Sequence, residues 1–250
     1  MTFSLRREEV IDIEQVQQLL EHNPGKAAQV VLAAAGQGLV EAQLLLGQIL
    51  LDGRGIERDP ALARRWFAIA AQSGSAMAHN MLGRCLEHGW GGAQALEQAV
   101  EHYRQAAQAG LDWGLYNYAN MLGTGRGIAA DQAAALEAYR QAAHSGHAKS
   151  MNLLGRYLEM GLACEADPQT AHIWYRRSAE AGDFRGQFSH AAVLAEHGDI
   201  DAALGWLELA ATHGNANFLR SSIATLEQAA EPRIRAMLSL YRERLIGLEA

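Results

Sequence analysis

One spacing runs through most of this 250-residue chain and limits what it can fold into more than any other feature. Alanines and glycines return in separate columns with a period of about 36 residues. Three of these columns are Ala63, Ala99, Ala135 and Ala171; Gly74, Gly110, Gly146 and Gly182; and Gly53, Gly89, Gly125 and Gly161. A period of this length indicates an array of stacked units, none of which can bury its apolar face alone.

Each period is predicted to hold two helices. In the first complete unit, apolar residues recur at helical spacing from Ala42 to Asp52, and Gly53–Gly55 (Gly-Arg-Gly) ends that segment. Asp59 and Pro60 then provide an N-cap and a first-turn proline for a second helix, which runs to Gly74. The alanine-rich composition agrees, because alanine is the best helix former and glycine commonly ends helices. The sequence therefore predicts an all-α fold.

Small residues also recur where neighbouring helices should approach closely. Gly47, Gly83 and Gly155 share one column, in which Ala119 and Ala191 take the related places. We expect the helices to pack tightly there, so that a larger side chain would overpack the contact. Aromatic residues are expected to fill the wider gaps between units: Trp66, Tyr103, Tyr139, Trp174 and Tyr175.

The first unit resembles a complete Sel1-like repeat, a relative of the tetratricopeptide repeat. The resemblance is carried by Leu46-Gly47, Gly53–Ile56, Asp59, Ala63, Trp66-Phe67, Ala70-Ala71 and Gly74, and the third and fourth units keep most of it. The second unit departs at His88–Gly92 and lacks the Asp cap, and the fifth has its loop shortened to Gly198-Asp199. The resemblance implies a right-handed α/α superhelix, or solenoid, of about five helix pairs with helical caps at both ends.

The columns also set the expected boundaries of the units. Residues 1–41 should form N-terminal capping helices and residues 218–250 the C-terminal ones, with repeats at 42–77, 78–113, 114–149, 150–185 and 186–217. The last segment is predicted to be interrupted at Glu231-Pro232 and to end in an amphipathic helix. Terminal units of this kind need a polar outer face to stop the array.

The resemblance implies a non-enzymatic scaffold or adaptor, of a kind common in bacteria, that binds a protein or peptide on the concave face lined by the first helices. Two recurring positions four residues apart should point the same way from each first helix. Together with His88, which follows Arg84 by four more residues, these positions make up the candidate site: Asn80, Arg84, His88, Tyr116, Asn120, Asn152 and Arg156. Asparagine amides suit an extended peptide backbone, and Arg84 and Arg156 suit an acidic or C-terminal carboxylate.

Two tryptophans stand where the repeat requires none. Trp90 lies in the loop of the second unit, and Trp113 lies between the second and third units. Tryptophan is enriched at the centres of protein interfaces, so either residue is a candidate aromatic anchor for a partner. Local packing is an equal alternative for both.

Composition and motifs argue against other classes of function. The net charge of −7 and a pI of about 5.8 do not fit a nucleic-acid-binding face. No apolar run is long enough to span a membrane, and Met1–Leu20 does not read as a secretory signal, so we expect a cytoplasmic protein. We expect no metal, cofactor or catalytic group, because none of the histidines stands at ligand spacing with a partner. Cys85 and Cys164 take columns of apolar residues and are predicted to be packed in the core.

Two alternatives to an adaptor remain. The chain could be a self-associating module that regulates a bacterial pathway, dimerising through the C-terminal helix with Leu238, Leu240, Tyr241 and Leu245. It could instead be an enzyme with a site built across repeats, although no convergent titratable groups can be assembled from the spacing. A strict monomer at low concentration would remove the first alternative.

Overall fold

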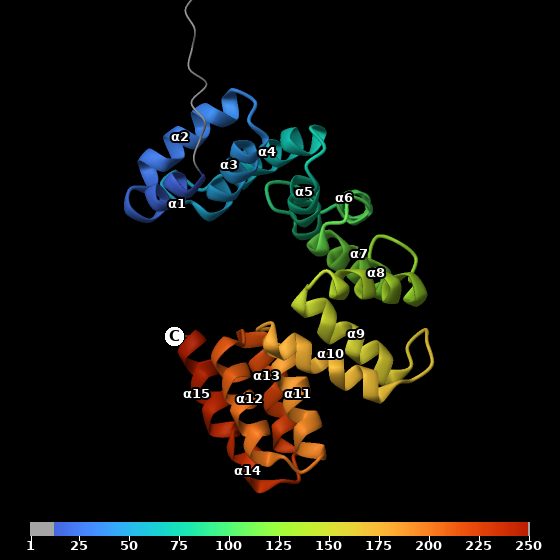
Figure 1. The fold of residues 1–250 in the computed structure, drawn as a ribbon. Coiled ribbons are helices and arrows are strands. Elements are labelled where there is room, and N and C mark those ends of the chain that lie inside the picture. Colours follow the sequence, from blue (N-terminus) through green and yellow to red (C-terminus); the bar gives the residue numbers. More distant parts are fainter. Residues whose placement is uncertain (1–12, 250) are drawn as a thin grey trace, which may run out of the picture. The chain divides into compact units, whose positions relative to one another are not determined.

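The structure is a computed structural model that describes residues 13–249 (Figure 1). Residues 1–12 of the predicted N-terminal capping segment, and Ala250, lie outside the described residues. Within the described part, every regular element is a helix. The chain divides into two compact units, of which the first holds residues up to Gly114 and the loop residues Arg126–Ile128, and the second holds the rest.

The first unit consists of consecutive helices that pack in sequence order. They are α1 (Ile13–His22), α2 (Pro24–Gly36), α3 (Val40–Asp52), α4 (Pro60–Gln72), α5 (Ala76–His88), α6 (Leu96–Gln108) and the start of α7 (Asp112–Thr124). Helix α3 packs against α4, and α5 against α6, as the two-helix repeat predicts. Helices α1 and α2 form a further pair ahead of the first repeat.

The second unit continues the same pattern and ends in a different one. Its helices are the rest of α7, α8 (Gln132–His144), α9 (Ala148–Met160), α10 (Pro168–Glu180), α11 (Phe184–Glu196), α12 (Ile200–His213), α13 (Ala216–Glu227), α14 (Pro232–Ala236) and α15 (Leu238–Glu249). Helix α9 pairs with α10, and α11 with α12. The predicted all-α fold of repeated helix pairs is confirmed.

The second helices begin as the sequence predicts. The side chains of Asp59, Asp131 and Asp167 each accept a hydrogen bond of 2.9–3.0 Å from the backbone N–H three residues on. Ala95 holds the same place before α6 and makes no side-chain bond, although its φ of −147° and ψ of 87° resemble those of Asp59. The aspartate therefore satisfies a helix end that the backbone adopts without it.

The alanine and glycine columns lie at the tightest contacts. Alanines at the main column are completely buried in all five repeats: Ala63, Ala99, Ala135, Ala171 and Ala203. A Cβ atom on Gly83 would lie 2.7 Å from the Tyr103 ring, and one on Gly155 would lie 2.6 Å from the Tyr175 ring. Both distances are too short for a methyl group, so the expectation that small residues allow close packing is confirmed.

One loop glycine shows how consecutive repeats are joined. Gly91 has a φ of +73°, and a Cβ atom there would lie 2.1 Å from the carbonyl oxygen of Pro60, at the start of α4. The loop after α5 thus rests directly on the backbone of the previous second helix. Only glycine allows both the backbone conformation and the approach.

The C-terminal end is closed by three helices where the sequence suggests one interrupted pair. Pro232 begins α14, a five-residue helix, and α15 then packs against α13 and α12. Tyr241 is completely buried and its hydroxyl donates to the Leu207 carbonyl at 3.0 Å. Leu238, Leu240 and Leu245 pack against the same core cluster. The apolar residues predicted to form a dimer interface are therefore largely used inside this unit.

None of the described helices combines the length and the hydropathy needed to cross a membrane.

Candidate functional site

In the first unit, the end of α5 and the loop after it bring three of the predicted site residues together. The Arg84 guanidinium carbon lies 5.1 Å from the centroid of the Trp90 ring, and the His88 ring lies 4.9 Å from the same ring. Trp90 occupies the loop position that Arg54 and Arg126 hold in neighbouring repeats. All three side chains are at least partly exposed, so they form a surface patch, which we call the Arg84–Trp90 patch.

Glu87 fixes the helix end that carries this patch. The Tyr103 hydroxyl donates to one carboxylate oxygen and an Arg126 guanidinium N–H donates to the other, both at 2.7 Å. The Glu87 side chain is only 13% exposed, and burial raises the pKa of the Tyr103 hydroxyl, which keeps that donor protonated. The last turn of α5 is therefore tied to α6 through Tyr103 and to the loop between α7 and α8 through Arg126.

Two predicted site residues are not available to a partner. Asn80 and Asn152 are each 3% exposed. The Asn152 Oδ1 accepts a hydrogen bond of 2.9 Å from the Ser189 hydroxyl on α11, so this position lies between consecutive first helices. The expectation that these two amides are open to a peptide is wrong, because both side chains are buried and that of Asn152 is bonded to the next first helix.

In the second unit, Tyr116 and Asn120 lie on α7 beside an aromatic cluster. The Tyr116 ring lies 4.8 Å from the His147 ring, and the Asn120 Oδ1 accepts a hydrogen bond of 2.8 Å from the Tyr139 hydroxyl. Asn120 is therefore engaged within the fold, while Tyr116 is half-buried. Arg156 on α9 is exposed and forms no ion pair with any residue that the structure describes.

The other candidate anchor, Trp113, lies near the start of α7. It is 39% exposed, and its backbone N–H is bonded to the Asp112 carboxylate at 2.6 Å. It belongs to the same column as Met77 and Lys149. Trp113 is separate in sequence and environment from the Arg84–Trp90 patch.

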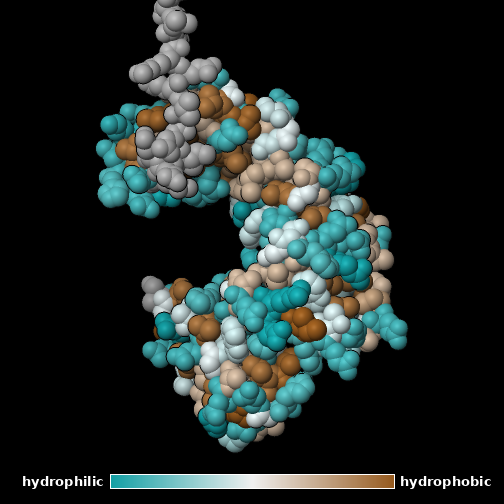
Figure 2. All heavy atoms as spheres, viewed as in Figure 1, coloured by the Kyte–Doolittle hydropathy of each residue, from teal (hydrophilic) through white to brown (hydrophobic). Residues whose placement is uncertain are grey.

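A largely apolar cavity of about 450 Å³ lies in the second unit between α11 and the C-terminal helices α13 and α14. Phe188, Ala191 and Ala195 line it from α11, and Leu226 and Ile234 line it from the C-terminal cap. Glu196 and Glu231 also contribute to its walls. Figure 2 shows hydrophobic side chains reaching the surface of this unit among hydrophilic ones. Sequence reasoning did not find this cavity, because its alanines (Ala191, Ala192, Ala195, Ala229 and Ala230) do not differ in pattern from those at tight helix contacts.

The family model described as Sel1 repeat matches residues 40–75, 76–111, 114–147, 148–183 and 194–215. These segments make up more than half of the chain. The chain belongs to the Sel1 repeat family. Members of this family are typically non-catalytic scaffolds for protein–protein interaction. A search of curated proteins found no match.

Solved structures show the same fold for this Sel1 repeat protein. A Sel1 repeat protein from Oxalobacter formigenes has a TM-score of 0.78 at 21% identity, covering 93% of this chain and 99% of that one. The protective antigen c5321 of uropathogenic Escherichia coli has a TM-score of 0.67 at 24% identity, covering 90% of this chain and 50% of that one. The immunity protein Pa5087 of Pseudomonas aeruginosa has a TM-score of 0.57 at 14% identity, covering 84% and 82%.

The candidate metal ligands and the thiols of this Sel1 repeat protein are accounted for by where they lie in the fold. Among the described side chains, no three histidines, cysteines, aspartates or glutamates are grouped so that they could hold a metal ion. Cys85 is fully buried, as predicted, and burial raises its pKa to about 11. Cys164 is only partly buried, with its thiol 3.7 Å from the Tyr157 carbonyl oxygen, so the expectation of core packing is too strong there.

Proposed function

We propose that this Sel1 repeat protein is a non-enzymatic scaffold that binds a peptide or protein segment on the concave face formed by its first helices. The observation that carries the proposal is the Arg84–Trp90 patch, in which a guanidinium stacks on a partly exposed indole 5.1 Å away. Arginine and tryptophan are the residues most enriched where protein interfaces gain their binding energy.

The patch is well prepared for binding. Tyr103 and Arg126 hold Glu87, so the turn that presents Arg84 and Trp90 loses little conformational freedom when a partner arrives. Packing within the repeat does not require tryptophan at position 90, since arginine serves there in the units before and after.

The proposed partner carries a carboxylate. Arg84 in the first unit and Arg156 in the second are both accessible cations, and neither is paired with a carboxylate among the described residues. Guanidinium groups bind carboxylates through two parallel hydrogen bonds, which suits an acidic side chain or a free C-terminus. With Asn80 and Asn152 buried, the backbone of the segment is not expected to pair with those amides.

Affinity measurements on a partner captured from the native cell test the proposal. Replacing Arg84 and Trp90 together with alanine should weaken binding at least tenfold, because it removes both halves of the patch. Arg140→Ala is the matched control, since Arg140 lies on the second helix α8 and pairs with Glu137 of the same helix. Equal affinity of the double variant and the wild type would contradict the proposal.

A second measurement tests the carboxylate preference separately from the binding of the peptide as a whole. The affinities of a bound peptide with a free C-terminus and of the same peptide amidated are measured for wild type, for Arg84→Ala and for Arg156→Ala. If the free peptide binds wild type more tightly than the amidated peptide does, and this difference in affinity is lost in either arginine variant, the carboxylate preference is supported. If neither amidation nor substitution of acidic residues in the peptide changes the affinity, the preference is contradicted.

Self-association remains a second candidate because of one observation at the end of α15. Ile246 and Leu248 are 68% and 58% exposed there. Sedimentation at low concentration decides between the two: a dimer that Ile246→Ser and Leu248→Ser convert to a monomer supports self-association, and a strict monomer excludes it.

A further inference from the structure

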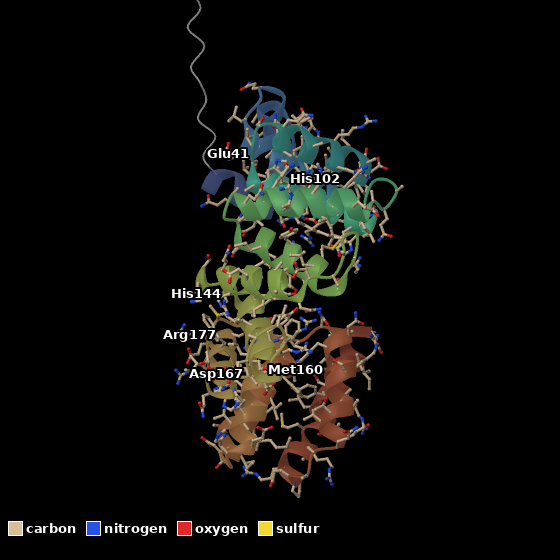
Figure 3. The ribbon with its side chains drawn as sticks, turned by 90° about the vertical axis from the view of Figure 1, so that its right-hand side faces the viewer. Glu41, His102, His144, Met160, Asp167 and Arg177 are labelled. Carbon is tan, nitrogen blue, oxygen red and sulfur yellow. The ribbon has the colours of Figure 1, made fainter. Side chains whose placement is uncertain are left out.

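A second cavity, of about 410 Å³, lies in the first unit between the second helices α4 and α6. Arg64 and Arg65 line it from α4, and Gln98 and His102 line it from α6. Leu82 and Leu86 of α5 line it as well. Figure 3 shows His102 on α6 in this part of the molecule. Four side chains able to donate hydrogen bonds thus surround one cavity, and its lining contains no acidic residue.

The two arginines at the cavity are not held in ion pairs within the described part of the chain, and the carboxylate beside its lining, that of Glu101 next to His102, is bonded to Arg104. Neither Arg64 nor Arg65 forms an ion pair with any described residue, whereas the nearby Arg104 pairs with Glu101 at 2.8 Å. Arg64 donates to the backbone carbonyl of Ala93 at 3.4 Å, which holds its guanidinium beside the loop after α5. Two positive charges therefore stand at the cavity in a protein whose net charge is −7.

The repeat does not require these arginines. The corresponding pairs in the next three repeats are Val100-Glu101, Leu136-Glu137 and His172-Ile173. Ala61, Arg64-Arg65 and Ala68 follow one another at about one helical turn, so small alanines flank the two arginines along the wall of the cavity. A packing role common to all repeats does not explain them.

The His102 ring is fixed at the edge of the cavity. Its Nδ1 lies 3.0 Å from Nδ1 of His79, and the two rings are stacked with centroids 5.3 Å apart. Because Nδ1 is occupied by this hydrogen bond, Nε2 is the nitrogen of His102 that can serve a ligand. The ring orientation does not have to be established when a ligand binds.

We propose that the cavity between α4 and α6 binds a phosphate group through Arg64, Arg65, Gln98 and His102. Two guanidinium groups match the double negative charge of phosphate better than the single charge of a carboxylate, and they offer paired donors to its oxygens. This site shares no side chain with the Arg84–Trp90 patch, although Gly91 of the loop that carries Trp90 also lines it, and it adds a second recognition function to the scaffold. The phosphate belongs either to a small free ligand or to a phosphorylated side chain of a protein.

Amide NMR of the full-length protein, titrated with inorganic phosphate at constant ionic strength, tests the site without any mutation. Shifts are expected for the amides of Ala61–Ala68 and Gln98–His102. Shifts confined to other helices, or none up to about 10 mM phosphate, overturn the proposal.

Variants and peptides then define the ligand. Arg64→Gln and Arg65→Gln should each weaken phosphate binding at least tenfold, with Arg140→Gln as the control that leaves it unchanged. A phosphoserine peptide that binds more tightly than inorganic phosphate identifies a modified protein as the source, and equal or weaker binding identifies a small ligand. A peptide with glutamate in place of phosphoserine that binds equally well contradicts the phosphate assignment.

Discussion

At the scale of the single residue, the array depends on positions where no side chain fits. Gly83 is the clearest, because the Tyr103 ring beside it is completely buried and its hydroxyl is bonded to Glu87. The ring cannot move aside without breaking that hydrogen bond. A glycine in this column is therefore a packing requirement of the helix pair.

We predict that Gly83→Ala lowers the free energy of unfolding by about 1–3 kcal/mol through overpacking. Gly205 is the matched control, since it lies inside α12 with nothing within 4 Å of its added Cβ. Gly205→Ala should instead raise stability by about 0.5–1 kcal/mol, because alanine is the better helix former. Urea unfolding of both variants measures these changes, and a neutral Gly83→Ala would show that the helices separate easily.

The two cysteines should differ in reactivity. Cys85 is fully buried and its pKa is raised to about 11, whereas Cys164 is partly exposed in the loop after α9. Because the thiolate is the reactive form, iodoacetamide at pH 8 should modify Cys164 and leave Cys85 intact. Peptide mass spectrometry reads the result. Urea-unfolded protein, in which both should react, is the reference, and equal labelling in the native state would contradict the assigned burial.

At the scale of the element, each second helix depends on how its first turn is capped. Helices α4, α8 and α10 follow Asp59, Asp131 and Asp167, whose carboxylates each accept a hydrogen bond from a backbone N–H of the first turn. Helix α6 follows Ala95 and has no side-chain cap. The backbone at Ala95 already has the capping conformation. Local sequence predicts this difference completely, because a cap involves residues only three positions apart.

We therefore predict that Ala95→Asp stabilises the protein by about 0.5–2 kcal/mol. Asp131→Ala, which removes the equivalent cap, should destabilise it by a similar amount. Thermal and urea unfolding of the two variants measure the changes. An Ala95→Asp variant without added stability would indicate that the N–H groups at the start of α6 are already satisfied in another way.

The first helices could be predicted less fully than the second. Their length and their glycine ends follow from local pattern, and the structure confirms α3, α5 and α9. The prediction that Asn80 and Asn152 lie on an open face was wrong, because each first helix in an array contacts a helix before it and a helix after it. A polar column can therefore be buried when a neighbour supplies a partner such as Ser189.

At the scale of the whole molecule, partly buried histidines link stability to pH. Burial lowers the pKa of His79 and His102 in the first unit and of His190 in the second below the usual 6.5. The unfolded chain thus binds protons more readily than the native one as pH falls through 6.5. The stabilisation from neutral histidines is complete above that pH and is lost as pH falls through the folded pKa values.

Wild-type protein should consequently unfold more easily at pH 5.5 than at pH 7.5. His102→Gln should show a smaller decrease, because one of the three histidines no longer titrates. Urea unfolding at both pH values, in buffers without phosphate or sulfate, measures the difference. The same pH dependence in variant and wild type would show that His102 is not responsible.

The sequence alone determined the 36-residue period, the helix pairs, the caps and the tight glycine and alanine contacts, because each follows from residues close together or equivalent by repetition. Tertiary structure decided what each column faces. It stacked Arg84 on Trp90, buried the two asparagines and placed Arg64 and Arg65 beside His102. These arrangements join separate helices, and a repeat pattern states which positions are equivalent without stating which side chains the next helix presents to them.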